Sequence, residues 1–72
     1  MDDEIFYRGY RIQAKIQQTV GGWLAGGKII KQHQDGRRQE WPLPDGAQVF
    51  KTKEEAQAES IASGKQLIDR WL

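Results

Sequence analysis

The stretch from Gly9 to Lys31 decides the fold and reads GYRIQAKIQQTVGGWLAGGKIIK. Its first half alternates strictly between apolar and polar side chains, the period-two pattern of a strand with one buried face. The apolar members are Tyr10, Ile12, Ala14 and Ile16, and the polar members are Arg11, Gln13, Lys15 and Gln17. Gly21-Gly22 then turns the chain, so the stretch predicts an antiparallel hairpin with strands over about residues 10–18 and 22–31.

The second strand of this hairpin contains two glycines, which leave its register open. Gly26 and Gly27 lie between the apolar pairs Trp23-Leu24 and Ile29-Ile30. A glycine within a strand often marks a bulge or the close approach of another backbone. A bulge here would change which side chains of the strand face inward.

A third strand is predicted over about residues 37–43, after the turn signal Asp35-Gly36. Pro42 has no N–H group to donate to a neighbouring strand, so this strand is expected at the edge of the sheet. One of its faces consists of Gln39, Trp41 and Leu43. The short connections predict a three-stranded antiparallel meander in sequence order, followed by a further turn at residues 44–46.

The C-terminal third of the chain predicts one helix. Thr52 and Glu55 fit a capping box, in which each side chain binds the other residue's backbone N–H. An apolar stripe then recurs at three- and four-residue spacing. Its members are Ala58, Ile61, Gly64 or Lys65, Ile68, and Trp71 or Leu72. A glycine within a helix costs about 1 kcal/mol relative to alanine, so Gly64 predicts that a bulky side chain from the sheet packs against the helix there, with Trp23 and Trp41 as candidates.

Together these elements predict a single α+β domain over residues 1–72, with the element order β-β-β-α. The helix is expected to pack on one face of the sheet, and the other face is expected to stay open to solvent. The acidic residues 1–4 are expected to fray. Residues 5–7 are apolar enough for a short strand or for an arm that covers a sheet edge, and both interpretations remain open.

The size and composition of the chain limit the classes of function that it can have. A chain of 72 residues forms one domain that buries about 60% of its unfolded surface, which is too little for a deep catalytic cleft. The absence of cysteine is typical of a reducing compartment. No apolar run is long enough to span a membrane, and the acidic N-terminus is unlike a signal peptide. We therefore expect a cytoplasmic protein with no membrane partner.

The sequence offers no constellation of residues for catalysis. His33 is the only histidine and lies in a polar turn, without a neighbouring nucleophile. Gly22–Lys28 has the glycine and lysine spacing of a phosphate-binding loop, but Ile29 stands where a magnesium-binding Ser or Thr is required. We therefore expect neither an enzyme nor a bound metal or cofactor.

The net charge of +1 conceals an uneven distribution of charge. Residues 5–38 carry seven basic side chains against one acidic side chain, whereas residues 39–72 carry four against six. The wet face of the hairpin is therefore cationic, and such a face can contact the phosphates of nucleic acid. Basic side chains on a sheet also discourage edge-to-edge aggregation, which is the alternative explanation. The candidate nucleic-acid-binding residues are Arg11, Lys15, Lys28, Lys31, Arg37 and Arg38.

Association with another protein is the second candidate function. Three tryptophans are many for 72 residues, and a thin core can leave an apolar patch exposed. Trp71 and Leu72, at the end of the helix, are the candidate interface through which a homodimer would form. The alternative is that all three tryptophans belong to the core.

Four short motifs resemble the HlyU-type family of small bacterial proteins. They are Tyr7–Ile12, then Gly22-Trp23 with Ala25-Gly26 and Ile29–Lys31, then Phe50–Ala56, and finally Lys65–Asp69. In order they are similar to the family's Tyr-x-Gly-Tyr/Phe opening, Gly-aromatic strand, Phe-x-Thr/Ser-x-Glu-x-Ala helix entry and basic-x-x-Ile-Asp helix end. The resemblance implies a transcriptional activator, although a chain with one expected helix has no helix-turn-helix. The sequence thus predicts a non-enzymatic binding or regulatory module, with nucleic acid and a second copy of the chain as candidate partners.

Overall fold

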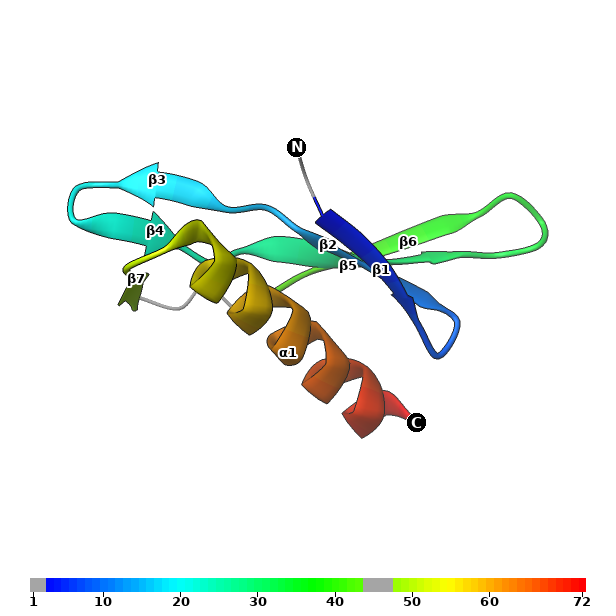
Figure 1. Ribbon diagram of the computed structural model, residues 1–72. Helices are drawn as coiled ribbons and strands as arrows, with labels where there is room; N and C mark the ends of the chain where they lie inside the picture. Colours follow the sequence, from blue (N-terminus) through cyan, green and yellow to red (C-terminus); the bar gives the residue numbers. More distant parts are fainter. Residues whose placement is uncertain (1–2, 44–47) are drawn as a thin grey trace.

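The computed structural model describes residues 3–43 and 48–72 (Figure 1). Within these residues the chain forms seven strands and one helix. They are β1 (Asp3–Tyr7), β2 (Tyr10–Ala14), β3 (Gln17–Thr19), β4 (Gly22–Leu24), β5 (Gly27–Gln32), β6 (Arg38–Pro42), β7 (Val49–Phe50) and α1 (Lys53–Trp71). All the strand pairs are antiparallel, so the predicted α+β class with a C-terminal helix is confirmed.

The predicted three-stranded meander is wrong, because the strands form two sheets rather than one. One sheet has the order β1-β2-β5-β6, and the other has the order β3-β4-β7. The long hairpin predicted over residues 10–31 is present, but its base (β2 and β5) belongs to the first sheet and its tip (β3 and β4) to the second (Figure 1). A single hairpin is therefore shared by both sheets.

The break between the two sheets leaves the register of the hairpin unchanged. Ala14 pairs with Gly27 on one side of the break, and Gln17 pairs with Leu24 on the other side. Two residues lie between these pairs on each strand, so neither strand gains an extra residue. The glycines of the second strand therefore mark the break without introducing a bulge.

A side chain from the helix supplies hydrogen bonds at this break. Ser60 of α1 is buried, and its Oγ donates to the carbonyl oxygen of Gly26 at 2.9 Å. The same Oγ accepts a hydrogen bond from the Gly26 N–H at 3.1 Å. The Gly26 carbonyl also accepts from the backbone N–H of Lys15 at 2.9 Å. Ser60 thus gives the Gly26 N–H a partner and adds a second hydrogen bond to the Gly26 carbonyl.

Replacing Ser60 with alanine is expected to destabilise the protein by about 1–3 kcal/mol, because the partly buried Gly26 N–H loses its partner. Urea denaturation followed by circular dichroism measures this difference. Ser63→Ala is the matched control, since the Ser63 hydroxyl only contacts the Glu59 carboxylate at 3.4 Å in an exposed position. An equal loss of stability in both variants would show that the contact with Gly26 has no special role.

The apolar residues 5–7 form a strand rather than a covering arm. This strand, β1, pairs with β2 along its whole length through the two-residue turn Arg8-Gly9. The φ angles in this turn are +51° and +87°, as in the type I′ turns that match the twist of a hairpin. Asp3 and Glu4 belong to β1 and not to a frayed lead, while residues 1 and 2 lie outside the described residues.

Of the last two strands, β6 lies where the sequence predicts and β7 was not predicted. β6 lies at the edge of the four-stranded sheet, as Pro42 predicts. Trp41 pairs with Ile29, and Leu43 is buried in the core. β7 pairs with β4 and was not expected, because two residues carry too little pattern to predict a strand. The turn expected at residues 44–46 lies outside the described residues.

The helix begins where the sequence predicts but buries a different stripe. The Thr52 hydroxyl accepts a hydrogen bond from the Glu55 N–H at 3.1 Å, which confirms the N-cap. The buried residues of α1 are Ala56, Ser60, Gly64 and Ile68. Ala58, Trp71 and Leu72 are exposed. The predicted stripe is therefore right at Gly64 and Ile68 and wrong at its two ends. Apolarity alone did not identify the stripe because polar Ser60 is one of its members.

Gly64 accommodates Ile12 of the sheet and not one of the candidate tryptophans. A Cβ atom at Gly64 would lie 2.7 Å from Cγ2 of Ile12. Ile12 belongs to the core cluster with Ile29, Leu43 and Ile68. The helix therefore approaches β2 closely at Gly64, and the core lies between α1 and the four-stranded sheet.

The four-stranded sheet has one covered and one uncovered face. The molecule is elongated, with extents of 43 × 23 × 16 Å, and α1 crosses one face of this sheet (Figure 1). The opposite face is not covered by any segment within residues 3–43 and 48–72. The helix is not long and apolar enough to cross a membrane.

Candidate functional site

The uncovered face of the four-stranded sheet is the candidate site. Because Ile12 and Ile29 face α1, their neighbours along β2 and β5 point to the opposite side. The strand register then assigns the side chains on that side. We call this surface the open face; its residues are Glu4, Phe6, Arg11, Gln13, Lys28, Ile30, Gln32, Arg38 and Glu40.

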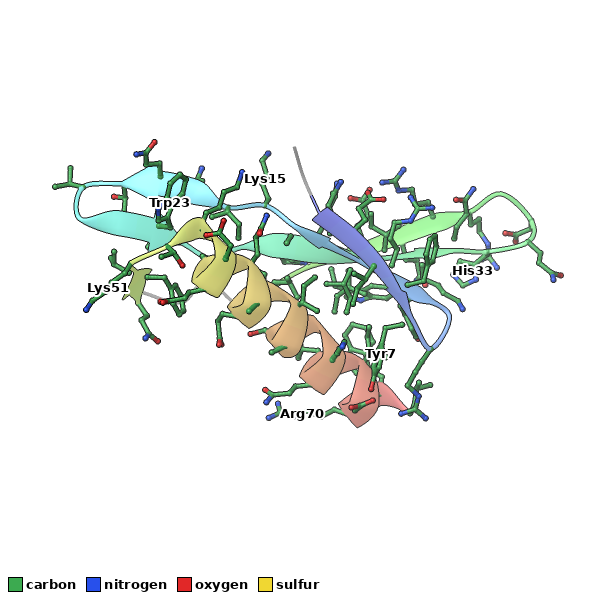
Figure 2. The ribbon with its side chains drawn as sticks, in the orientation of Figure 1. Tyr7, Lys15, Trp23, His33, Lys51 and Arg70 are labelled. Atoms are coloured by element: carbon green, nitrogen blue, oxygen red, sulfur yellow. The ribbon has the colours of Figure 1, made fainter. Side chains whose placement is uncertain are left out.

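The alternation predicted for residues 10–14 is confirmed. Ile12 and Ala14 are buried, while Arg11 and Gln13 are partly exposed on the open face. Lys15 is exposed and projects away from α1 (Figure 2). The polar surface proposed from the first strand therefore exists along this strand.

Two carboxylates pair with the cations of the open face. Glu40 bonds Lys28 Nζ at 2.6 Å through Oε1 and Arg38 Nε at 3.2 Å through Oε2. The hydrogen bond from Lys28 is the main cause that lowers the pKa of Glu40 below its ordinary value. Glu4 accepts a hydrogen bond from Gln13 at 2.9 Å and lies 3.8 Å from Arg11 Nε. The open face is therefore a surface of mixed sign and not the cationic field expected from the sequence.

The remaining candidate cations do not join this surface. Lys31 lies on the side of the sheet that faces α1, with Nζ 4.9 Å from the centroid of the Tyr10 ring. Arg37 lies in the β5–β6 turn, where Nε bonds the Asp35 carboxylate at 2.6 Å. Of the six candidate nucleic-acid-binding residues, the open face thus gathers three, Arg11, Lys28 and Arg38, while Lys15 projects from the same side just beyond the end of β2 (Figure 2). The prediction that Lys31 extends the patch is wrong because strand alternation turns it to the other face.

A hollow lies on the open face beside an exposed aromatic ring. It measures about 140 Å³ and is lined by Phe6, Gly9, Arg11, Ile30 and Gln32. The Phe6 side chain is 78% exposed, whereas Ile30 is only 3% exposed. The Arg11 guanidinium lies 5.2 Å from the centroid of the Phe6 ring, and Arg11 Nε has no hydrogen-bond partner among the described residues. The hollow thus combines an apolar surface with an incompletely bonded cation.

The sequence analysis missed both apolar members of this site. The conformation of residues 5–7, which include Phe6, was not decided from the sequence. The two residues Arg8-Gly9 between Tyr7 and Tyr10 are, however, typical of a hairpin turn, and this hairpin pairs Phe6 with Arg11. Ile30 follows Ile29, so one of these two side chains must face away from the core. Both signals are present in the sequence, but neither identifies a hollow, which requires three strands in register.

A clamp of polar side chains holds the β1–β2 turn against the end of the helix. Asp69 accepts hydrogen bonds from Tyr7 Oη and Arg8 Nη1, each at 2.9 Å, and Tyr7 points toward the helix end in Figure 2. The hydrogen bonds from Arg8 and then Tyr7 hold the pKa of Asp69 below its ordinary value. The bond to Asp69 in turn raises the pKa of the Tyr7 hydroxyl. This clamp orients the strand that carries Phe6.

Trp71 belongs to an aromatic cluster at the same end of the core as this clamp, since Tyr10 of the cluster pairs with Tyr7. The ring centroid of Trp71 lies 5.0 Å from that of Trp41 and 5.6 Å from that of Tyr10. Trp71 remains 41% exposed and Leu72 61% exposed. Much of Trp71 therefore serves the packing of α1 on the sheet, and the interface expected at Trp71 and Leu72 stays a prediction.

The described residues offer little for catalysis or metal binding. They contain no group of three or more His, Cys, Asp or Glu side chains that could hold a metal ion. His33 Nε2 bonds Gln39 Oε1 at 2.9 Å. The hollow next to it, about 360 Å³, is lined by His33, Arg37, Arg38 and Gln39, a set without a carboxylate or a nucleophile.

Comparisons with protein-family models, with curated proteins and with solved structures gave no match to this chain. The resemblance to the HlyU-type family therefore stays a prediction based on the four motifs. The function has to be inferred from the geometry and charge of the open face.

Proposed function

We propose that this protein is a non-enzymatic binding module that contacts another protein through the open face. The observation that carries the proposal is the exposed Phe6 ring beside the hollow over Ile30, on an uncovered sheet face. Aromatic side chains and arginine are enriched in the centres of protein interfaces, and charged pairs surround them at the rim. Phe6 with Arg11 supplies such a centre, and the ion pairs of Glu40 supply part of such a rim.

The charges of the open face favour a protein over nucleic acid as the partner. Glu40 lies between Lys28 and Arg38, and a phosphate that approached either cation would meet this carboxylate. Each phosphate contact gains free energy by releasing counterions, and cations that are already paired have less to gain. The HlyU-type resemblance supports a regulatory role, which a protein-binding module can perform without contacting DNA.

An NMR titration tests the class of ligand directly. N-acetylphenylalaninamide, used as a probe for an aromatic side chain of a partner, is expected to shift the amide signals of Phe6, Arg11 and Ile30. Arg11→Gln is expected to weaken the binding of this probe, because it removes the cation that lines the hollow and lies over the Phe6 ring. Val20→Ser is the matched control, since Val20 is 98% exposed at the distant β3–β4 turn.

The same NMR titration with duplex DNA and with duplex RNA at low salt tests the alternative that the partner is nucleic acid. We expect the amides of residues 11–17 to keep their positions during both titrations. Shifts in these amides that disappear at high salt, and that Arg11→Glu with Lys15→Glu abolishes, would replace the proposed partner with nucleic acid. Failure of the aromatic probe to shift the open face would contradict the proposal independently.

A further inference from the structure

We infer that the protein on the open face is a second copy of this chain, and that the Phe6 ring of each copy fills the hollow of the other. This inference rests on the proposed function, because it names the partner of the same surface. Three features of the open face carry it: the fit of the hollow to a ring, the position of ring and hollow on one surface, and the mixture of charges around them.

The hollow has the size of a phenyl ring. Its volume is about 140 Å³, and an engineered apolar cavity of about 150 Å³ is known to bind benzene. Ile30 lies at the buried floor of the hollow, and Phe6 supplies its exposed apolar edge. Arg11 also lines the hollow, so its guanidinium can contact such a ring as it contacts the Phe6 ring of its own copy. A phenylalanine side chain is therefore a suitable occupant.

Phe6 is the exposed aromatic side chain that this surface itself presents. It stands at the edge of the hollow and is 78% exposed, so its own copy does not bury it. A two-fold axis brings the same patch of both copies together. A protruding ring next to a hollow is complementary to itself under such an axis, since each ring can enter the hollow of the other copy and both hollows are filled.

The charges around the ring are also compatible with a second copy. The open face carries three cations, Arg11, Lys28 and Arg38, and two carboxylates, Glu4 and Glu40. A surface of one sign would repel its own copy, whereas on this surface the cations and carboxylates largely neutralise each other within each copy, so charge does not oppose the approach of a second copy.

The size of the face predicts a weak dimer. Four strands about 4.8 Å apart, each with about five residues rising about 3.3 Å, give a footprint of about 15–20 Å on each side. Over both copies this footprint is about 450–800 Å², below the roughly 1,000 Å² that a stable specific interface buries. We therefore expect a transient dimer with a dissociation constant in the submillimolar range, and the association has to be measured at high protein concentration.

Sedimentation equilibrium over concentrations up to about 1 mM covers the weak association expected of an interface of this size. The wild-type mass is expected to rise from monomer to dimer. Phe6→Ser is expected to raise the dissociation constant by about tenfold or more, the loss typical of an interface centre. Val20→Ser, an equally exposed apolar residue on another part of the molecule, and Leu72→Ser are expected to leave it unchanged.

A second measurement does not depend on any variant. In a sample that mixes isotope-labelled and unlabelled chains, filtered NOE spectra report only contacts between copies. They are expected to contain a contact between the Phe6 ring of one copy and the Ile30 methyl groups of the other.

Two results would overturn the inference. One is a strict monomer at the highest concentration, and the other is a dimer that Leu72→Ser disrupts and Phe6→Ser does not. Binding of N-acetylphenylalaninamide to a strictly monomeric protein would leave the proposed function standing and remove only the second copy as partner. A protein that neither dimerises nor binds N-acetylphenylalaninamide would contradict the proposed function as well.

Discussion

Replacing Gly27 with alanine is expected to leave the protein largely unfolded. Gly27 has a φ angle of +139°, and L side chains in such a conformation cost about 1–3 kcal/mol. A Cβ atom there would also collide with the carbonyl oxygen of Gln13 on the neighbouring strand and lie 3.1 Å from Cα of Ala14. Both obstacles are backbone atoms of the central strand β2, which cannot move without separating β2 from β5. A domain of this size has only about 4–10 kcal/mol of stability to lose.

Gly36→Ala separates the two causes of this effect. Gly36 also has a positive φ, +91°, but a Cβ atom there would meet nothing within 4 Å. The control is expected to lose about 1 kcal/mol and to stay folded. Circular dichroism and amide NMR spectra at 25 °C distinguish the two variants. Similar stabilities for Gly27→Ala and Gly36→Ala would mean that β2 and β5 do not approach each other as closely as the structure describes.

Removing the side chain of Ile12 is the second change with a large expected effect. Ile12 is fully buried at the centre of the core, so Ile12→Ala is expected to cost about 2–5 kcal/mol. Gly64→Ala is expected to destabilise as well, although alanine favours a helix by about 1 kcal/mol. The reason is that the new Cβ would lie 2.7 Å from Cγ2 and 2.9 Å from Cδ1 of Ile12, and close packing leaves the isoleucine no room to move.

The double variant gives the decisive comparison. With Ile12 shortened to alanine, the collision at residue 64 disappears, and the methyl group of Gly64→Ala occupies part of the cavity. Gly64→Ala is therefore expected to change sign, from destabilising in the wild type to stabilising beside Ile12→Ala. Urea denaturation of the four proteins measures this coupling. The same sign in both backgrounds would contradict the contact between helix and sheet at this position.

Gly27 and Gly64 mark the two positions where the architecture depends on a glycine backbone lying close to a neighbouring element. Gly27 lies at the last pair before the four-stranded sheet gives way to the small sheet, and Gly64 lies where the helix meets β2. Both positions orient the strands that carry the open face. Variants at these sites therefore serve as folding controls, whereas Phe6 and Arg11 test binding.

The sequence predicted which side chains of β2 form the candidate site, but it did not predict the mixed charge of the surface. Alternation placed Arg11 opposite Ile12, which proved correct. The pairing of Lys28 with Glu40 was not predictable, because these residues are brought together by the register of β5 and β6 and by side-chain rotamers. A count of charges along the chain therefore suggested a cationic surface where the fold forms ion pairs.

The sequence by itself determined the elements that depend on neighbouring residues: the buried side of residues 10–14, the edge position of the strand with Pro42, and the N-cap at Thr52. Period-two alternation, a missing N–H group and a capping hydroxyl each act within a few residues. Only the tertiary structure showed that one hairpin serves two sheets, because the register continues across the break and the side chain that bonds Gly26 there is Ser60, 34 residues away along the chain. It also decided that Phe6, Arg11 and Ile30 share a hollow, since that requires three strands to lie side by side.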